Sequence, residues 1–295
     1  MKITPQDGIM GATVSGFEFG RASEQDLDDL LEVMYRDKIV VLKGQHLDST
    51  EFIEFGRALG TVETYYEPMY HHPEYPEIFV SATKPEEGGQ VGVPKTGKFW
   101  HADYSFMPKP FGITMIYPQV VPKKNRGTYF IDMGAAFQAL PADLKDVVTA
   151  TVTEHSPRRY FKIRPSDVYR PIRELQEEIE KETPGVVHPT VIDHPVTGER
   201  VLYVSEGFAY ELRNPDDGAP LPDHLLEQVL REAGQLDSTF SHPGIHTQRF
   251  TEGDLMIWDN RSLVHRALHT TKPEPAVSHR VTVHDRHPFY EGVER

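Results

Sequence analysis

The chain has 295 residues, 38% hydrophobic and 10% aromatic, with charges of both signs throughout, which excludes a disordered or fibrous protein. Its formal net charge of −14 argues against a general nucleic-acid binder, because phosphate affinity comes mostly from clustered Lys and Arg. The absence of cysteine excludes disulfides, thiolate metal sites and cysteine nucleophiles, so any metal chemistry must use His, Asp and Glu.

Neither a membrane span nor a secretory signal is expected. No apolar run approaches the roughly 18 residues that a transmembrane helix needs. The first residues, MKITPQDGIMGATVSGFEFG, lack the basic and apolar regions of a signal peptide. We therefore expect a cytoplasmic protein without a membrane partner.

Helix and strand signals alternate in the first part of the chain. Ser23 is the expected N-cap of a helix over residues 24–38, in which leucines recur at helical spacing. A buried strand, IVVLKG, follows, and Ser49 is the expected N-cap of a second helix over residues 50–59. EIFVSAT, residues 77–83, then predicts another strand.

The remainder of the chain predicts more strands than helices. Residues 84–98 are rich in Gly, Pro and charge and predict a mobile loop or lid, since loops of this length are usually functional or disordered. Strands are expected at 98–106, 112–121, 127–133, 255–259 and 280–285, helices at 141–150, 172–182 and 222–234, and a hairpin joining 190–195 to 200–206. This pattern predicts one α+β domain over residues 1–295, built on a jelly-roll barrel, with helical insertions near 134–240.

The stretch FWHADYSF, residues 99–106, places a histidine and an aspartate two positions apart. Side chains two apart in a strand point to the same face, so His101 and Asp103 would project together. With one more histidine they would make the two-His-one-carboxylate triad that suits non-haem Fe(II) and leaves positions open for a cosubstrate and dioxygen. Taken alone, such a pair is more often a polar pair at the end of a strand.

His265, in IWDNRSLVHRALH, is the candidate third ligand because it follows an apolar strand. Fifteen positions later, Arg280 shares a strand face with Thr282 and His284. A lone arginine among valines is usually a surface charge. An arginine that faces a barrel interior instead needs a carboxylate partner, which its planar fork binds bidentately.

The combination of His101, Asp103, His265 and Arg280, with GTYFID between, resembles the taurine dioxygenase class of Fe(II)/2-oxoglutarate-dependent oxygenases over nearly the whole chain. The resemblance implies an α+β fold whose jelly-roll core is a double-stranded β-helix. It also implies that His101, Asp103 and His265 hold the iron, while 2-oxoglutarate serves as cosubstrate and dioxygen as oxidant.

The same resemblance implies that Arg280, helped by the hydroxyl of Thr128, holds the distal carboxylate of 2-oxoglutarate. His269 is either a residue near this cosubstrate or a surface histidine, and Arg126 is a further candidate beside it. Taurine dioxygenases usually carry another arginine eleven residues after the distal histidine, where this chain has Ala276. We expect Arg280 to take over the cosubstrate carboxylate, which argues against taurine as the substrate.

Four segments, YYEPMYHHPEYPEIFVS, FWHADYSFMPKPF, HSPRRYFKIRPSDVYRPI and IHTQRF, resemble the isonitrile-forming oxygenases of isonitrile lipopeptide biosynthesis. This narrower resemblance implies oxidation of an N-carboxymethyl-3-amino fatty acid, the glycine adduct of an alkenoyl chain, to an isonitrile with loss of carbon dioxide. Two molecules each of 2-oxoglutarate and dioxygen would be consumed. The implied partner is a small carboxylate substrate from a free or carrier-bound fatty acyl chain, with no nucleic acid.

Four basic residues fall within residues 158–164 of this acidic chain, either as a pocket for carboxylates or as a solvated basic loop. By the resemblance, Lys162 and Arg164 hold a substrate carboxylate. The tyrosines that either line this pocket or belong to an aromatic core patch are Tyr65, Tyr66 and Tyr70.

Two other interpretations of the sequence make different predictions. A conventional hydroxylase of the taurine dioxygenase superfamily would use the same iron and cosubstrate on a small carboxylate but release a hydroxylated product. A non-enzymatic barrel with a structural metal would need no cosubstrate anchor. The presence of Arg280 and Thr128 therefore favours an enzyme.

Overall fold

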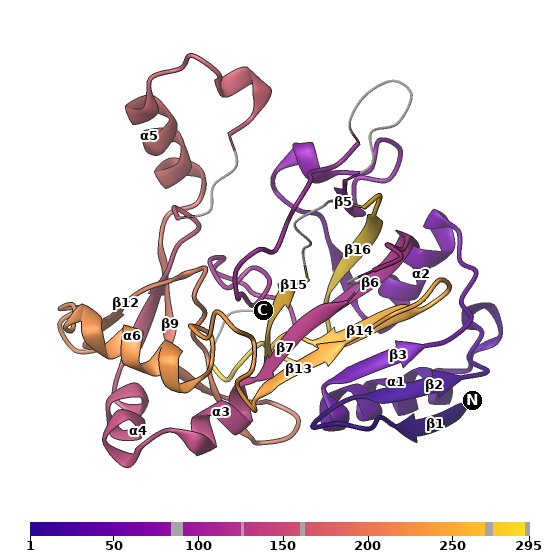
Figure 1. The fold of residues 1–295 in the computed structure, drawn as a ribbon, viewed down its shortest axis with the longest axis horizontal. Helices are drawn as coiled ribbons and strands as arrows, with labels where there is room; N and C mark the ends of the chain where they lie inside the picture. Colours follow the sequence, from indigo (N-terminus) through magenta and orange to yellow (C-terminus); the bar gives the residue numbers. More distant parts are fainter. Residues whose placement is uncertain (84–90, 125–126, 160–162, 269–273, 293–295) are drawn as a thin grey trace.

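Two β-sheets form the centre of the computed structural model, which describes residues 1–83, 91–124, 127–159, 163–268 and 274–292 (Figure 1). The larger sheet has the strand order β1-β2-β3-β14-β6-β16-β4, with β5 also paired to β16. Its strands are β1 (Lys2–Pro5), β2 (Ala12–Ser15), β3 (Ile39–Leu42), β4 (Thr61–Glu63), β5 (Phe79–Ala82), β6 (Ile113–Val120), β14 (Leu255–Asp259) and β16 (Val277–His284). The smaller sheet has the order β13-β7-β15, formed by β13 (Ile245–Gln248), β7 (Thr128–Asp132) and β15 (Leu263–Ala267).

Apolar side chains hold the two sheets together. Phe130 of β7 and Leu263 of β15 belong to one buried cluster with Val41 of β3 and Trp258 of β14. The rings of Phe130 and Trp258 meet edge to face at a centroid distance of 5.4 Å. Two sheets that pack in this way form the double-stranded β-helix core, so the predicted α+β fold class is confirmed.

Two helices cover the other face of the larger sheet, α1 (Glu24–Asp37) and α2 (Ser49–Leu59). Their apolar faces pack in one cluster with Val281 and Val283 of β16. The predicted cap of the first helix is confirmed, because the Ser23 side chain accepts a hydrogen bond from the backbone N–H of Asp26. The helix ends where Lys38 takes a left-handed φ of 68°.

The cap of the second helix differs from the prediction. The side chain of Asp48 accepts a hydrogen bond from the backbone N–H of Glu51, and the Glu51 carboxylate accepts one from the N–H of Asp48. Ser49 is therefore the first helical residue, and its assignment as the N-cap was wrong. The physical reason is that the preceding aspartate completes a reciprocal capping box.

Most of the remaining elements lie between β7 and β13 and project to one side of the two sheets (Figure 1). They are α3 (Met133–Ala139), α4 (Ala142–Thr149), β8 (Val152–His155), η3 (Pro165–Asp167), α5 (Ile172–Glu182), β9 (Val186–Pro189), β10 (Val191–Asp193), β11 (Arg200–Leu202), β12 (Ala209–Arg213) and α6 (Asp223–Glu232). The predicted hairpin is present as the antiparallel pair β10 and β11. The insertion expected to be helical thus also contains strands, and β12-β8-β9 form a sheet of their own.

The strand expected over residues 98–106 is wrong. Within the described residues 91–124, this stretch makes only an isolated bridge at His101 and then turns, with Tyr104 at a left-handed φ of 60°. The turn is closed by a hydrogen bond from the N–H of Met107 to the carbonyl of Tyr104. The bridge joins His101 to His265, and the turn at Tyr104 then carries the chain away before a longer ladder can form, so the alternation of the sequence produces no strand.

Part of the loop expected over residues 84–98 can be placed. Residues 84–90 lie outside the described residues, and their mobility stays a prediction. Val93 runs beside β5, where its N–H donates to the carbonyl of Val80 and its carbonyl accepts from the N–H of Ala82. Residues 95–98 then pass over the cavity described below.

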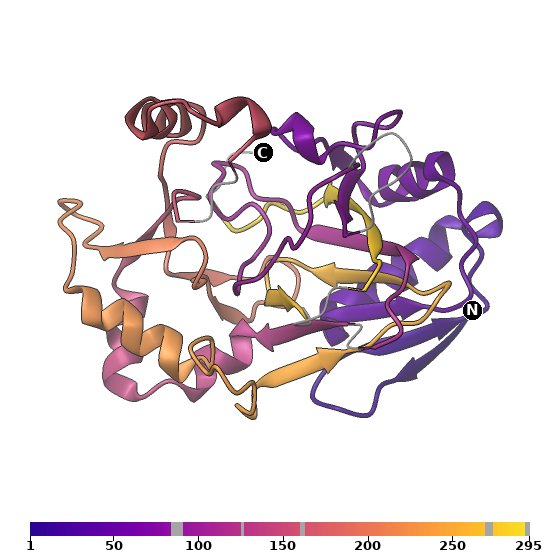
Figure 2. The same ribbon diagram turned by 45° about the horizontal axis from the view of Figure 1, so that its top comes forward.

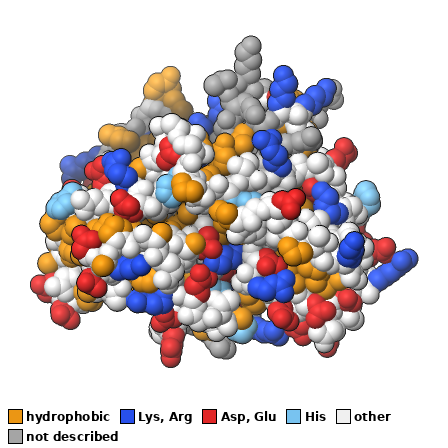
Figure 3. Space-filling view, turned by 60° about the horizontal axis from the view of Figure 1, so that its bottom comes forward, with side chains coloured by type: hydrophobic (Ala, Val, Ile, Leu, Met, Phe, Trp, Pro, Cys, Tyr) orange, Lys and Arg blue, Asp and Glu red, His pale blue; other side chains and the backbone are white. Residues whose placement is uncertain are grey.

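The outer surface agrees with the composition. Acidic and basic side chains are interspersed over the face seen in Figure 3.

Two short 3-10 helices, η1 (Phe19–Arg21) and η2 (Pro68–Tyr70), complete the first third of the chain. Figure 2 shows η2 at the same end of the molecule as α5. Of the helices within the described ranges, none combines the length and apolar character needed to cross a lipid bilayer.

Candidate active site

The structure brings together the three predicted metal ligands. His101, Asp103 and His265 are buried, and each offers one ligand atom within 4.8 Å of the others. The Nε2 atom of His101 lies 3.7 Å from Oδ1 of Asp103, and the Nε2 atom of His265 lies 3.8 Å from Oδ2. Two imidazole nitrogens and a carboxylate therefore converge on one point, as one divalent metal ion requires.

Backbone hydrogen bonds set this convergence. The N–H of His101 donates to the carbonyl of His265 at 3.0 Å, and the N–H of His265 donates to the carbonyl of His101 at 2.8 Å. The two imidazole rings lie side by side with centroids 4.1 Å apart. Since β15 is itself paired to β7, this bridge fixes the His101 segment to the rim of the smaller sheet.

The protonation of the three groups also suits metal binding. Nδ1 of His101 lies 2.9 Å from the carbonyl of Phe99, which can only accept, so Nδ1 carries the proton and Nε2 presents its lone pair to the site. Burial lowers the pKa of His101 and holds that of His265 well below its usual value. Both imidazoles are therefore neutral, as ligands must be.

Asp103 remains ionised in this buried position. Burial acts most strongly and would raise the pKa of Asp103, but the charge of Arg280, the two neighbouring histidines and the Thr114 hydroxyl together hold the pKa below its usual value. Nη1 of Arg280 donates to Oδ1 of Asp103 at 2.5 Å, and the hydroxyl of Thr114 donates to Oδ2 at 3.0 Å. The carboxylate thus keeps its charge and is held by a donor on each oxygen.

A cavity of about 430 Å³ opens directly onto the triad. All three triad residues line it, together with Arg280 and Thr128. Such a volume lies within the range of pockets that enclose small molecules. The metal ligands and the two residues expected to hold a cosubstrate therefore face one shared space.

Comparison with known proteins agrees with this arrangement. Residues 2–283 match the family model described as taurine catabolism dioxygenase TauD, TfdA family. The chain belongs to this family. It is an Fe(II)/2-oxoglutarate-dependent dioxygenase, an oxidoreductase that uses dioxygen.

The sequence identity between this chain and individual relatives is low. Pentalenolactone F synthase of Streptomyces arenae is 28% identical over 277 residues, covering 90% of this chain and 89% of the relative. Alpha-ketoglutarate-dependent 2,4-dichlorophenoxyacetate dioxygenase of Cupriavidus pinatubonensis is 26% identical over 276 residues, covering 89% of this chain and 90% of the relative. The crystal structure of a taurine dioxygenase from Burkholderia xenovorans has a TM-score of 0.74 at 19% identity, over 99% of this chain and 92% of its own, which supports the fold.

The triad of this TauD/TfdA-family chain fits Fe(II). Its donor set of two neutral imidazoles and one carboxylate is the set that non-haem iron oxygenases use. Nδ1 of His265 is buried without a hydrogen-bond partner among the described residues, so the ring is held by its backbone and by packing against Trp258 at a centroid distance of 4.8 Å. His101, Asp103 and His265 would therefore hold the metal on one side and leave its cavity side open.

The residues predicted to hold 2-oxoglutarate lie around the same cavity. Thr128, at the start of β7, has 6% of its surface exposed. Arg280 on β16 has 12% of its side chain exposed and stacks on the ring of Phe79 at 4.0 Å. Its carboxylate partner in this structure is Asp103, so a cosubstrate carboxylate bound by Arg280 would share or replace that contact. His269 and Arg126 lie outside the described residues.

The three tyrosines form one aromatic wall of the cavity. The ring of Tyr65 lies 4.7 Å from that of Tyr66 and 5.1 Å from that of Tyr70, measured between centroids. Burial raises the pKa of Tyr65 well above its usual value and also raises that of Tyr66, so the hydroxyls stay protonated. Tyr65 also packs against Tyr104 at 5.0 Å, which makes it both a pocket residue and part of an aromatic cluster.

The structure describes one of the two basic residues that were predicted to hold a substrate carboxylate. Lys162 lies outside the described residues. Arg164 is not among the residues that line the cavity. Its guanidinium donates to Asp167 at 3.0 Å and to Glu178 of α5 at 2.6 Å. Its Nη1 atom lies 3.7 Å from the carboxylate of Glu67, a buried residue that does line the cavity.

Three residues that contact the triad segment were not identified from the sequence. Thr114 is a polar residue within the apolar strand β6, and this single polar position could have been noticed in the sequence. Asn260 belongs to the polar run between β14 and β15. A polar run between two apolar strands could have been recognised as a turn. Glu206, which accepts a hydrogen bond from the N–H of Trp100 at 3.1 Å, lies in a loop without any local signal.

Proposed function

We propose that this dioxygenase converts an N-carboxymethyl-3-amino fatty acid, the glycine adduct of an alkenoyl chain, into the corresponding isonitrile. The N–CH2–COOH group loses four hydrogens and one carbon dioxide. Two molecules each of 2-oxoglutarate and dioxygen accept these hydrogens and give two succinates, two further carbon dioxides and two waters. The reaction belongs to the secondary metabolism of isonitrile lipopeptides.

The charge of the cavity is the observation that carries this proposal. The chain as a whole has 31 basic and 45 acidic residues. Among the described residues that line the cavity, the balance is reversed, with five basic residues, Lys95, Lys98, Arg159, Arg266 and Arg280, and three acidic ones, Glu67, Asp103 and Glu206. Such a balance favours anions, and a cosubstrate and a substrate that each carry two carboxylates need it.

Lys162 and Arg164 are the proposed partners of a substrate carboxylate. Arg164 reaches the cavity wall through Glu67, and it would have to turn from that residue toward the cavity to bind a substrate. Asp167 and Glu178 accept hydrogen bonds from the other nitrogens of its guanidinium. These contacts support the proposal that the Arg164 guanidinium lies at the edge of the cavity as a cation available to a substrate carboxylate.

The aromatic wall orients the reacting part of the substrate. Tyr65, Tyr66 and Tyr70 offer apolar rings that exclude water from the methylene beside the iron site. Iron and 2-oxoglutarate, when bound, supply the oxidising equivalents with dioxygen. His101, Asp103 and His265 would hold the metal, Arg280 and Thr128 the distal carboxylate of the cosubstrate, and His269 and Arg126 are further proposed contacts.

A conventional hydroxylase is the second candidate. The relatives named above are described as a pentalenolactone F synthase and a dichlorophenoxyacetate dioxygenase, so isonitrile formation rests on the four resembling segments and on the cavity. A hydroxylase would use the same triad and cosubstrate to hydroxylate a small carboxylate substrate. The mass of the product distinguishes the two reactions.

The test uses an N-carboxymethyl-3-amino acid as substrate and mass spectrometry after trapping of the isonitrile with a tetrazine. Wild-type enzyme should form the trapped adduct with two succinates for each isonitrile. Lys162→Ala and Arg164→Ala should nearly abolish it, because an anion left poorly paired in a partly dry pocket costs ~2 to 5 kcal/mol.

Arg170→Ala is the matched control for Arg164→Ala. Arg170 binds the same two carboxylates, at 3.2 Å from Asp167 and 2.6 Å from Glu178, but has no proposed contact with the substrate. Arg170→Ala should therefore keep isonitrile formation while losing ion pairs to the same two carboxylates. A wild-type product that is only hydroxylated would exclude the proposal and leave the dioxygenase assignment intact. Full isonitrile yield in both Lys162→Ala and Arg164→Ala would do the same.

A further inference from the structure

The turn between β14 and β15 reaches across the fold to the metal site. Asn260, which has no exposed surface, places its side chain against the backbone of Asp103. Its Oδ1 atom accepts a hydrogen bond from the N–H of Asp103 at 2.9 Å. Its Nδ2 atom donates to the carbonyl of Asp103 at 2.8 Å and to the carbonyl of Phe111 at 3.1 Å. One side chain thus satisfies both backbone groups of a residue 157 positions away.

Asp103 depends on such a partner because it lies outside any strand. A buried backbone N–H and C=O without a sheet partner must find hydrogen bonds elsewhere. The next residue, Tyr104, has a left-handed φ of 60°, a conformation that is strained for a bulky side chain and persists only where its surroundings impose it. The amide of Asn260 holds the peptide groups on both sides of Asp103, and the hydrogen bond from Met107 to Tyr104 closes the turn that follows.

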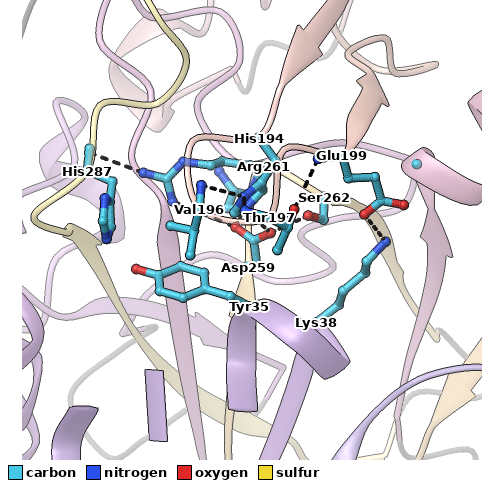
Figure 4. Close-up of polar contacts among 12 residues, drawn as sticks. Tyr35, Lys38, His194, Val196, Thr197, Glu199, Asp259, Arg261, Ser262 and His287 are labelled. Carbon is cyan, nitrogen blue, oxygen red and sulfur yellow. Dashed lines mark hydrogen bonds and ion pairs between the residues drawn. The ribbon is translucent and has the colours of Figure 1, made fainter. Parts of the chain in front are cut away.

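The turn that carries Asn260 is itself immobilised by a buried polar network (Figure 4). Asp259 accepts hydrogen bonds from Ser262 and from His194, the latter at 3.0 Å. Arg261 donates to both carboxylate oxygens of Asp285, at 3.0 and 2.6 Å. The N–H of Asn260 donates to the carbonyl of Gly112 at 2.8 Å. The residues on either side of Asn260 therefore hold the turn in place, while its side chain points to the metal site.

We propose that Asn260 is a positioning residue that aims the carboxylate of Asp103 at the iron. An aspartate side chain has only two rotatable bonds, so the position of its backbone decides where its oxygens lie. Thr114 and Arg280 contact the carboxylate itself, whereas Asn260 acts through the peptide groups. It also joins the two ligand-bearing segments, because the turn that carries it leads directly into β15 and His265.

The experiment measures metal binding rather than activity alone. Asn260→Leu keeps the branched shape of the side chain but removes every hydrogen bond to Asp103. We expect the affinity of the protein for Fe(II) and Co(II) to fall roughly 10- to 100-fold, as is typical when a partner of a metal ligand is removed. The absorption spectrum of the Co(II) form should change as well, since the geometry of the ligands changes. Both are measured well below the unfolding temperature.

Gln45→Met is the matched control. Gln45 is another buried side-chain amide, with 3% of its surface exposed, and its Nε2 atom donates to the carbonyls of Phe17 and Lys43 at 2.9 and 3.0 Å. Its loss should lower the thermal stability without changing metal affinity or the Co(II) spectrum. If Asn260→Leu does not fold, the smaller Asn260→Ala, which also removes these hydrogen bonds, serves in its place. Wild-type affinity and an unchanged Co(II) spectrum in a folded Asn260 variant would overturn the proposal.

Discussion

His101 and His265 are tied together by their backbones in both directions, with N–H to carbonyl distances of 3.0 and 2.8 Å. The two residues thereby form an antiparallel pair outside any longer ladder. Because these bonds use no side-chain atom, a substitution of either imidazole leaves the bridge itself available. The ligands of the site can therefore be removed one at a time without removing the connection that holds the two segments together.

Loss of a triad ligand should abolish metal uptake. Asp103→Ala and His265→Ala each remove one of the three groups that converge within 4.8 Å, and we expect no stoichiometric Fe(II) in equilibrium dialysis and no succinate from 2-oxoglutarate. His284→Ala, at a half-buried residue near Glu63, is the control and should bind Fe(II) normally. Succinate release at the wild-type rate in either triad variant would show that the assignment of the triad is wrong.

Arg280→Lys should weaken the use of 2-oxoglutarate. The planar guanidinium grips a carboxylate with two hydrogen bonds and stacks on Phe79, whereas lysine offers a point charge. The apparent KM for 2-oxoglutarate should rise roughly ten-fold or more, in line with ~1.5 to 3 kcal/mol for a hydrogen bond to a charged group. Arg286→Lys, whose partner is the exposed Asp28, should leave this KM unchanged. An unchanged KM in Arg280→Lys would mean that another residue anchors the cosubstrate.

Arg261→Met should be the most destabilising of these substitutions. Arg261 has 1% of its side chain exposed and pairs with the buried Asp285. Removing the cation leaves that carboxylate without its charged partner, which costs about 3 to 5 kcal/mol. Urea denaturation should show this loss, while Arg231→Met, which breaks an exposed pair with Glu227, should cost roughly 0.5 kcal/mol or less. Equal midpoints for the two variants would contradict the prediction.

The stability of the metal-free protein should fall as the pH falls below about 6.5, the value for an unperturbed histidine. Burial lowers the pKa of His155 well below that value, so between the two pKa values the unfolded chain binds a proton that the folded protein excludes. This stability is fully present above the unfolded pKa and is lost toward the folded one, at up to ~1.4 kcal/mol per pH unit. His155→Leu should flatten the slope of unfolding free energy against pH. The exposed His224 provides the control, and His224→Leu should retain the wild-type slope.

The sequence alone determined the elements whose signals are local. The Ser23 cap, the helix that follows it and the β10–β11 hairpin form as predicted because a cap, an apolar stripe and a turn each act within a few residues. The absence of cysteine limited the ligands of any metal site to His, Asp and Glu, and the resemblance to the taurine dioxygenase class implied the choice of His101, Asp103 and His265.

Only the tertiary structure decided how these residues are held. The His101 segment was predicted as a strand from its alternation, yet it makes only one bridge, to His265 of β15, before the chain turns, and the side chain of Asn260 holds the turn. The partner of Arg164 was equally undecided, because the sequence predicts the helix that carries Glu178 but not the position of that helix beside Arg164. In each case the deciding hydrogen bond joins residues whose proximity depends on the packing of the whole chain, and no local pattern encodes that proximity.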